Sequence, residues 1–281
     1  MSKPCIICSE WNTTLIKVED QLPVVRCRKC GLVYADDQGR DEVEFQARHY
    51  EDLYADSDGH GEPESRKILL SKFLRTGRGK RLVRGKKNVL DIGCGRGFFL
   101  HLLSKFGDKE LYGVDTSENA IQFLEKSHGI NGFAGTLEDA GFRDDYFDLI
   151  TLWDVLEHVP EPRFMLAEIR RVLRGGGKVF IRVPNAHYLL LKHYVWEKLF
   201  GKEKCFIPRF HYYNYSPGNL RRILEEEGFG RIDIRPGMPE IYGHLVRRVV
   251  HRVLYGLSLF IFMVMRKVTF TCFMIEAEAA K

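Results

Sequence analysis

Four cysteines near the start of the chain are spaced for metal binding. Cys5 and Cys8 form one C-x2-C pair, and Cys27 and Cys30 form a second pair after eighteen intervening residues. Two such pairs are typical of a tetrahedral zinc site with four thiolate ligands. Because four thiolates leave no open coordination position, we expect a structural zinc and not a catalytic one. Disulfides or unrelated buried thiols are the alternative, and a reducing compartment disfavours disulfides.

A glycine-rich turn later in the chain has the form of a ligand-binding loop. Gly93, Gly95 and Gly97 let the backbone pass close to a ligand, while the helix that follows directs its N–H groups at it. Asp115 ends the next predicted strand, where a carboxylate can accept hydrogen bonds from both hydroxyls of a ribose. Asp91 at the start of the turn disfavours a pyrophosphate, so we expect a nucleoside that carries an ammonium group.

Alternating strand and helix patterns position these residues on one sheet. The pattern predicts an α/β fold with a Rossmann-like, doubly wound and largely parallel sheet that helices cover on both faces. Ligands bind outside the carboxyl ends of the strands in such sheets, which is where the glycine-rich turn and Asp115 fall. Strands are predicted over 89–91, 111–114, 131–135, 147–152 and 178–183, and helices over 98–106, 117–127, 162–173 and 216–227.

The same segments resemble a known enzyme family. The run Asp91-Ile-Gly-Cys-Gly-Arg-Gly97, followed by Gly113-Val-Asp115, is similar to motifs I and post-I of the class I S-adenosylmethionine-dependent methyltransferases. The run from Phe147 to Pro160 resembles the branch that includes the ubiquinone-biosynthesis O-methyltransferases. The resemblance implies a seven-stranded sheet and S-adenosylmethionine as cofactor. It places the following residues at the cofactor: Asp91, Gly93, Cys94, Gly95, Gly97, Asp115, Thr116, Thr136, Leu137, Glu138 and Trp153.

Two details of the resemblance bear on the adenine and on the acceptor. Relatives often carry Asp where this chain has Thr136, so the contact with adenine would come from a backbone group or a hydroxyl. The run from Phe210 to Ser216 resembles a subgroup with an N-terminal zinc ribbon, many of whose members modify sugars, lipids or cell-surface precursors.

Two histidines are candidate catalytic residues for such a reaction. Methyl transfer from a sulfonium is an in-line displacement, so the enzyme mainly aligns and desolvates the reactants and removes a proton from a hydroxyl acceptor. His158 follows the fourth predicted strand, and His211 lies in an aromatic stretch before the last helix of the core. Histidine titrates near neutral pH, so either could be the general base. The alternative role for His158 is packing that closes the cofactor pocket.

Composition limits the class of protein and its division into parts. With 281 residues, of which 44% are apolar and 29% charged, the chain fits a soluble protein with a buried core and not a disordered or polytopic membrane protein. Its net charge of +5 is small for a dedicated nucleic-acid binder, and no secretory signal is visible, so we expect a cytoplasmic location. The predicted parts are a zinc ribbon at 1–35, a connecting arm and leading helix at 36–87, and a methyltransferase domain at 88–281.

The connecting arm and the tail have unusual charge. The acidic stretch 34–61 is expected to fold over the mouth of the active site, and 78–87 to be a solvated linker. Residues 241–275 contain no Asp or Glu, and 241–265 predict a basic amphipathic helix before a last strand at 267–277. The apolar run 257–265 is shorter than the roughly 18 residues that a membrane span requires. The helix is therefore expected to lie on an anionic membrane or to be buried against protein as a lid or dimer contact.

The predicted function is S-adenosylmethionine-dependent O-methylation of a small hydroxylated acceptor, such as a glycan, a lipid-linked compound or a quinone-like precursor. A basic amphipathic helix would bring a cytoplasmic catalyst to a membrane-borne acceptor. The alternative is a zinc-ribbon RNA methyltransferase or nucleic-acid binder. The run Trp153-Asp-Val-Leu156 disfavours it, because amino-methylating nucleic-acid enzymes resemble Asn/Asp-Pro-Pro-aromatic at this place.

Overall fold

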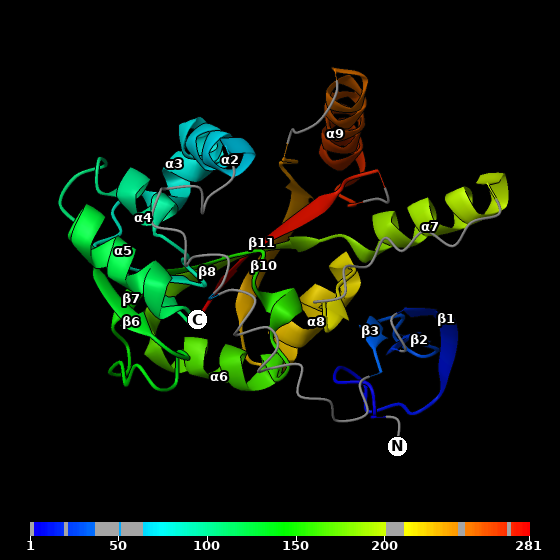
Figure 1. Ribbon diagram of the computed structural model, residues 1–281, viewed down its shortest axis with the longest axis horizontal. Coiled ribbons are helices and arrows are strands. Elements are labelled where there is room, and N and C mark those ends of the chain that lie inside the picture. The colour runs from blue at the N-terminus through cyan, green and yellow to red at the C-terminus, as the bar shows by residue number, and fades with distance from the viewer. Residues whose placement is uncertain are drawn as a thin grey trace.

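A seven-stranded sheet forms the centre of the molecule (Figure 1). The computed structural model describes residues 3–19, 22–36, 51, 64–200, 211–240, 245–268 and 271–281. The strands are β4 Asn88–Ile92, β5 Glu110–Asp115, β6 Asn131–Ala134, β7 Phe147–Trp153, β8 Leu173–Pro184, β10 Gly230–Gly237 and β11 Met274–Ala280. Their order is β10-β11-β8-β7-β4-β5-β6, with β11 antiparallel to both neighbours and the other pairs parallel. This arrangement confirms the predicted fold class.

Helices cover both faces of this sheet and form two hydrophobic cores. The helices are α2 Glu64–Arg75, α3 Gly77–Val83, α4 Phe98–Leu103, α5 Glu118–His128, α6 Pro162–Val172 and α8 Pro217–Glu226. Val89 packs with side chains of α2 to α5, whereas Leu90, next in the same strand, packs with side chains of α6 and α8. Strand β7 is buried along its whole length because both of its faces are covered.

A second, smaller sheet contains the N-terminal segment. Its strands are β1 Thr13–Glu19, β2 Leu22–Cys27, β3 Val33–Ala35 and β9 Tyr213–Asn214, in that order. Strand β9 comes from far along the chain, between the large sheet's β8 and α8. The small sheet therefore joins the N-terminal segment to the main body of the protein.

Two sequence predictions differ from the structure. Residues 78–87 were expected to form a solvated linker, but most of them lie in α3, which Thr76 caps by accepting the N–H of Gly79. Leu82 and Val83 are buried, and the basic residues before them in the sequence made this short apolar side of α3 difficult to recognise. The last strand begins at Met274 and not at residue 267, because the pairings of β11 with β8 and with β10 both begin at Met274.

Two long helices extend from the sheet (Figure 1). Helix α7, Ala186–Phe200, has no counterpart among the sequence predictions, whereas α9, Leu245–Met265, falls in the predicted range. The apolar part of α9 is longer than predicted: Arg248–Met265 has a mean hydropathy of 1.5 and is long and apolar enough to cross a membrane. Only 17% of that stretch is buried among the described residues, so most of α9 does not pack against its own chain, and a membrane contact and a dimer contact both stay predictions.

Candidate active site

The glycine-rich turn joins β4 to α4 at the carboxyl end of the large sheet. Gly93, Gly95 and Gly97 have φ angles of +64°, +52° and +74°, a region that glycine adopts without strain. Asp115, which ends β5, accepts the N–H of Gly95 at 2.8 Å and the N–H of Ser117 at 3.0 Å. Burial raises the pKa of Asp115. Since a carboxylate can accept about four hydrogen bonds, Asp115 fixes the turn and keeps capacity for a ribose.

Two other predicted residues in the turn are held by protein groups. Asp91 is buried, and its Oδ1 accepts the hydroxyl of Thr151 at 2.5 Å. Cys94 is also buried, and its thiol donates to the carbonyl of Gly95 at 3.4 Å. Both side chains therefore lie beside the turn with fixed orientations.

The loops after β5 and β6 bring the predicted adenine-side residues to the same edge. The N–H of Gly135 donates to the carbonyl of Asp115 at 2.8 Å, which joins the two loops. Thr116 is exposed beside Asp115, Leu137 is buried, and Glu138 is half-buried. The hydroxyl of Thr136 donates to Asp139 at 2.7 Å, its N–H donates to the same carboxylate at 3.4 Å, and its carbonyl accepts the N–H of Ala140 at 3.3 Å, so all three groups have partners within this loop.

Trp153 lies in the core behind the turn. Its ring centroid is 5.0 Å from that of Phe73, 5.1 Å from that of Phe99 and 4.7 Å from that of Phe180. Only 3% of Trp153 is exposed. The structure therefore places Trp153 as a support for the end of β7, where the sequence predicted a contact with the cofactor.

Glu51 is the single described residue between positions 37 and 63. Its Oε1 accepts the side-chain N–H of Asn119 at 2.6 Å, at the start of α5. Its charge contributes to the raised pKa of Asp115. Glu51 of the acidic stretch therefore lies near Asp115, and the rest of the predicted cover over the active site lies outside the described residues.

A buried charge network follows directly after β7. Asp154 has a φ angle of +58°, and its Oδ2 forms ion pairs with Arg182 of β8 and Arg66 of α2. Arg66 also donates to the carbonyl of Trp153 at 2.6 Å. Burial would raise the pKa of Asp154, but the two guanidinium groups outweigh it and hold that pKa below its ordinary value. The network fixes α2, β7 and β8 to one another.

Glu157, His158 and His211 form a cluster beside this network. The atoms that they could offer to a metal ion or a proton lie within 4.8 Å of one another. Burial raises the pKa of Glu157 well above its ordinary value, and neither carboxyl oxygen has a hydrogen-bond partner among the described residues. Burial lowers the pKa of His211 to about 3, and its Nδ1 lies 3.2 Å from Asn214 Oδ1. A carboxyl that resists ionisation, next to an uncharged imidazole, can bind a proton or a cation.

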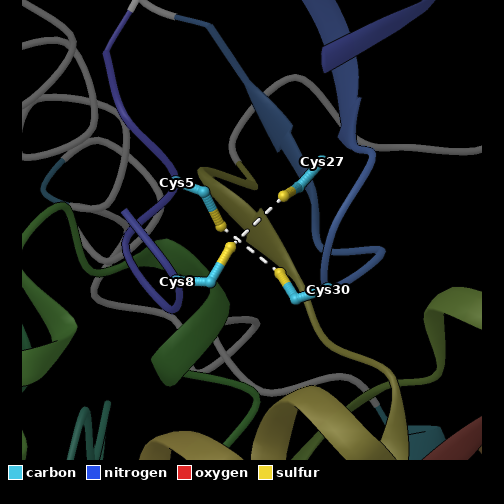
Figure 2. Close-up of side chains that lie close together, drawn as sticks. All are labelled: Cys5, Cys8, Cys27 and Cys30. Atoms are coloured by element: carbon cyan, nitrogen blue, oxygen red, sulfur yellow. Dashed lines mark hydrogen bonds between the residues drawn. The ribbon is translucent and has the colours of Figure 1, made fainter. Parts of the chain in front are cut away.

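The four cysteines of the N-terminal segment point at one centre (Figure 2). The Sγ atoms of Cys5 and Cys30 are 3.4 Å apart, as are those of Cys8 and Cys27. Zinc–sulfur bonds of about 2.3 Å in a tetrahedron require sulfurs roughly 3.8 Å apart, which a small outward adjustment provides. The four residues therefore fit a zinc ion.

Comparison with known proteins identifies the family. A family profile described as "Methyltransferase domain" matches residues 65–232. The chain belongs to this family. It is 33% identical, over 159 residues, to the ubiquinone biosynthesis O-methyltransferase of Coxiella burnetii, and the match covers 53% of this chain and 65% of that protein. The chain thus matches less than two thirds of that methyltransferase's length.

Solved structures show that the fold is that of the S-adenosylmethionine-dependent methyltransferases. One from Archaeoglobus fulgidus has a TM-score of 0.53 and 24% identity, and the match covers 76% of this chain and 94% of that one. A Haloferax volcanii methyltransferase, solved in complex with the Trm112 activator, has a TM-score of 0.55 and 17% identity, covering 82% and 96%. The resemblance found in the sequence is thereby confirmed.

Sequence reasoning missed three charged residues of this methyltransferase site. Glu157 stands in the quoted run directly before His158, and a carboxyl next to a candidate base was the available signal. Arg182 interrupts the apolar strand β8, which marks it as a buried charge in need of a partner. No sequence signal pointed to Arg66, because it lies in a helix 88 residues from Asp154.

Proposed function

We propose that this chain is a methyltransferase that uses S-adenosylmethionine to methylate a hydroxyl oxygen of a small acceptor. The cluster of Glu157, His158 and His211 carries the proposal, because it places proton-binding groups beside the carboxyl end of β7. The name of the Coxiella burnetii relative supports oxygen as the methylated atom and a quinone-like precursor as one acceptor class. A glycan or a lipid-linked compound with a free hydroxyl would meet the same chemical requirement.

One half of the site, which we call the cofactor half, consists of the turn from Gly93 to Gly97 and Asp115, and it binds and orients the cofactor. S-adenosylmethionine held here would supply a methyl group on a positively charged sulfur, with S-adenosylhomocysteine as the leaving group. The backbone of Gly93 to Gly97 would lie against the cofactor, and Asp115 would accept hydrogen bonds from its ribose hydroxyls. The buried surroundings of Asp115 exclude water, which strengthens each of these hydrogen bonds.

The other half, which we call the acceptor half, consists of the cluster of Glu157, His158 and His211 and the neighbouring charge network around Asp154. It holds the acceptor's hydroxyl and takes its proton. As the oxygen forms its bond to the methyl carbon, the hydroxyl proton passes to the cluster of Glu157, His158 and His211. The ionised form of Glu157 takes the proton, because burial raises the pKa of this carboxyl well above its ordinary value and makes its carboxylate a stronger base than usual. The imidazole of His211 beside it stays uncharged at neutral pH and can relay the proton. The cluster can therefore share one proton among three groups, and a divalent cation bound there would serve the same purpose by stabilising an alkoxide.

Labelled S-adenosylmethionine tests this function directly. Wild type, Glu157→Gln and His211→Asn would be assayed on catechol, glycolipid, nucleotide-sugar and RNA acceptors. We expect transfer to a hydroxyl and a fall in kcat of about 100-fold in both variants, with cofactor affinity unchanged. His128→Asn, which lies outside the cluster, is the matched control. Full turnover in both variants would exclude the cluster, and transfer only to RNA would establish the alternative function. Metal analysis of Glu157→Gln beside wild type separates the two roles of the cluster, because a cation bound there would be lost in the variant while the ion on the four cysteines would remain.

We further propose a structural zinc ion on Cys5, Cys8, Cys27 and Cys30. Their convergent sulfurs support this ion, and thiolates in a closed site have no position for a substrate. Metal analysis should give one zinc per chain, which the double variant Cys27→Ser/Cys30→Ser loses and Cys272→Ala retains. A metal-free wild type with four freely titrating thiols would contradict this site.

We also propose that the outer face of α9 rests on an anionic membrane in the cytoplasm. The inner stripe of His251, Ser258 and Phe262 is buried, and Ser258 shares a hydrogen bond of 2.7 Å with Thr271. The opposite face is apolar and exposed, and Arg248 and Arg252 are exposed on the same helix. The exposed apolar residues are Val249, Val250, Val253, Leu257, Phe260, Met263, Val264 and Met265. Positive charge without any acid from 241 to 275 favours anionic lipid.

The topology of the sheet argues that α9 lies on the membrane and does not cross it. Strands β10 and β11 are neighbours, and Gly237 pairs with Met274, so both ends of the α9 insertion return to one place. If α9 crossed the bilayer, residues 266–273 would have to cross back. Eight residues that include Arg266 and Lys267 are too few for the second helix of about 20 residues that hydrocarbon requires. A helix that lies in the interface satisfies the sheet and the apolar face together.

Vesicle flotation tests the membrane contact. Wild type should float with phosphatidylglycerol-containing vesicles and less with pure phosphatidylcholine, and Val253→Asp/Phe260→Asp should abolish flotation. Phe164→Asp is the control, since Phe164 is 64% exposed but lies on α6. Wild type that stays unbound and forms a dimer broken by Val253→Asp would assign the face to a second copy of the chain.

A further inference from the structure

The ribbon formed by residues 3–36 shares its sheet with the segment that carries His211. Strand β3 pairs with β9 through Val33 with Asn214 and Tyr34 with Tyr213. The N–H of Ala35 extends this pairing by donating to the carbonyl of Tyr212 at 3.1 Å. Among the described strands β9 pairs only with β3, and two residues cannot form a stable strand without such a partner.

Side-chain contacts hold both cysteine pairs against the main body. Arg163 at the start of α6 donates to the carbonyl of Ile6 at 2.6 Å, between Cys5 and Cys8. Asn219 in the first turn of α8 donates to the carbonyl of Cys30 at 2.9 Å. Each metal-binding turn is thus fixed to a helix beside the acceptor half of the site.

The ribbon also contacts the other end of the same chain segment. Leu190 of α7 forms a small apolar cluster with Val24 and Val33 of the ribbon. The segment from α7 to β9 is therefore held by the ribbon at both ends. His211 precedes β9 by two residues, and Asn214 of β9 is its hydrogen-bond partner, so the place of β9 sets the place of the imidazole.

We propose that the ribbon is a positioning element that places His211 beside Glu157 and His158. The inference rests on the proposed function only for the role given to His211; the placement itself follows from the shared sheet. A displacement of about 1 Å in a reacting group can cost roughly 100-fold in rate. The reaction therefore requires that the pairing of β9 with β3 of the ribbon fixes the position of His211. The zinc site would then act on turnover through β9, while the cofactor half, which shares no strand with the ribbon, remains intact.

Ala35→Pro tests the placement, because it deletes the N–H that reaches Tyr212 and leaves the N–H of Asp36, which donates to Pro23 within the ribbon. Ala35→Gly keeps the N–H and is the matched control. Hydrogen exchange of the full chain should show faster exchange of the 211–216 amides in Ala35→Pro, with β5 amides and S-adenosylhomocysteine affinity unchanged. Chelator-treated wild type should also show faster exchange of the 211–216 amides, and the exchange should slow again when zinc is restored. This second measurement tests the placement even if Ala35→Pro does not fold.

Kinetics then test the role of the placement. On the acceptor that the labelled-cofactor assay identifies, Ala35→Pro should lower kcat at least tenfold with the KM for S-adenosylmethionine within twofold of wild type, while Ala35→Gly stays within twofold in both. Unchanged exchange at 211–216 after zinc removal would overturn the placement. Faster exchange at 211–216 with an unchanged kcat would overturn the role of the ribbon in turnover. A chain that binds no cofactor is a different outcome, and it would contradict the proposed function itself.

Discussion

The cofactor half and the acceptor half of this site are constructed differently. In the cofactor half, Asp115 holds the glycine-rich turn through backbone N–H groups from neighbouring loops. In the acceptor half, Asp154 forms ion pairs with Arg66 of α2 and Arg182 of β8, which lie far apart in the sequence. His211 lies on the segment whose strand β9 pairs with the ribbon. If the proposed function is correct, cofactor binding would therefore depend on one local unit, whereas acceptor chemistry would depend on contacts between elements far apart in the sequence.

The largest expected effect comes from removing a charge of the acceptor half. Arg182 is almost fully buried, so Arg182→Met leaves the charge of Asp154 with only Arg66 to balance it. We expect the free energy of unfolding to fall by about 3–5 kcal/mol, measured by urea denaturation. Arg171→Met is the control, because the ion pairs of Arg171 with Asp144 and Glu168 are more exposed and should be worth about 1 kcal/mol or less. Equal losses in both variants would remove the contrast between the two halves.

The next effect concerns the cofactor half. Asp115→Ala removes the acceptor of the Gly95 and Ser117 N–H groups and of the proposed ribose contacts. Binding of S-adenosylmethionine should weaken by about 1.5–3 kcal/mol, which is roughly 10- to 100-fold in the dissociation constant by calorimetry. Asp108→Ala, which removes an exposed carboxylate in the loop before β5, should bind within about twofold of wild type. Affinity that Asp115→Ala leaves intact would place the cofactor elsewhere.

A smaller effect is the pH dependence of stability in the acceptor half. The pKa of His211 is lowered from 6.5 to about 3, so the unfolded chain binds the proton more readily than the folded one. The stability from the uncharged imidazole is fully present above pH 6.5 and is lost as pH falls toward 3. Wild type should lose about 2 kcal/mol more than His211→Gln between pH 7.5 and 5, measured by urea denaturation at each pH. Parallel profiles for the two proteins would show that His211 is not buried.

The contrast also explains what the sequence could and could not predict. The glycine-rich turn and Asp115 are close in sequence and shaped by local backbone requirements, so their pattern predicts their place. The two histidines were named as candidates, but their contact at a ring-centroid distance of 4.8 Å needs the pairing of β3 with β9, which a two-residue strand does not signal. The start of β11 was misplaced because strand ends depend on partners that only the folded sheet supplies.

Calorimetric titration of S-adenosylmethionine into wild type and into Glu157→Gln tests whether the cofactor half binds its ligand independently of the acceptor half. If the two halves are separate, both proteins should bind the cofactor with a stoichiometry of one per chain and affinities within about twofold, while the kcat of Glu157→Gln is about 100-fold lower. Absence of binding to wild type would contradict the methyltransferase assignment, and loss of binding in Glu157→Gln alone would contradict the division of the site into a cofactor half and an acceptor half.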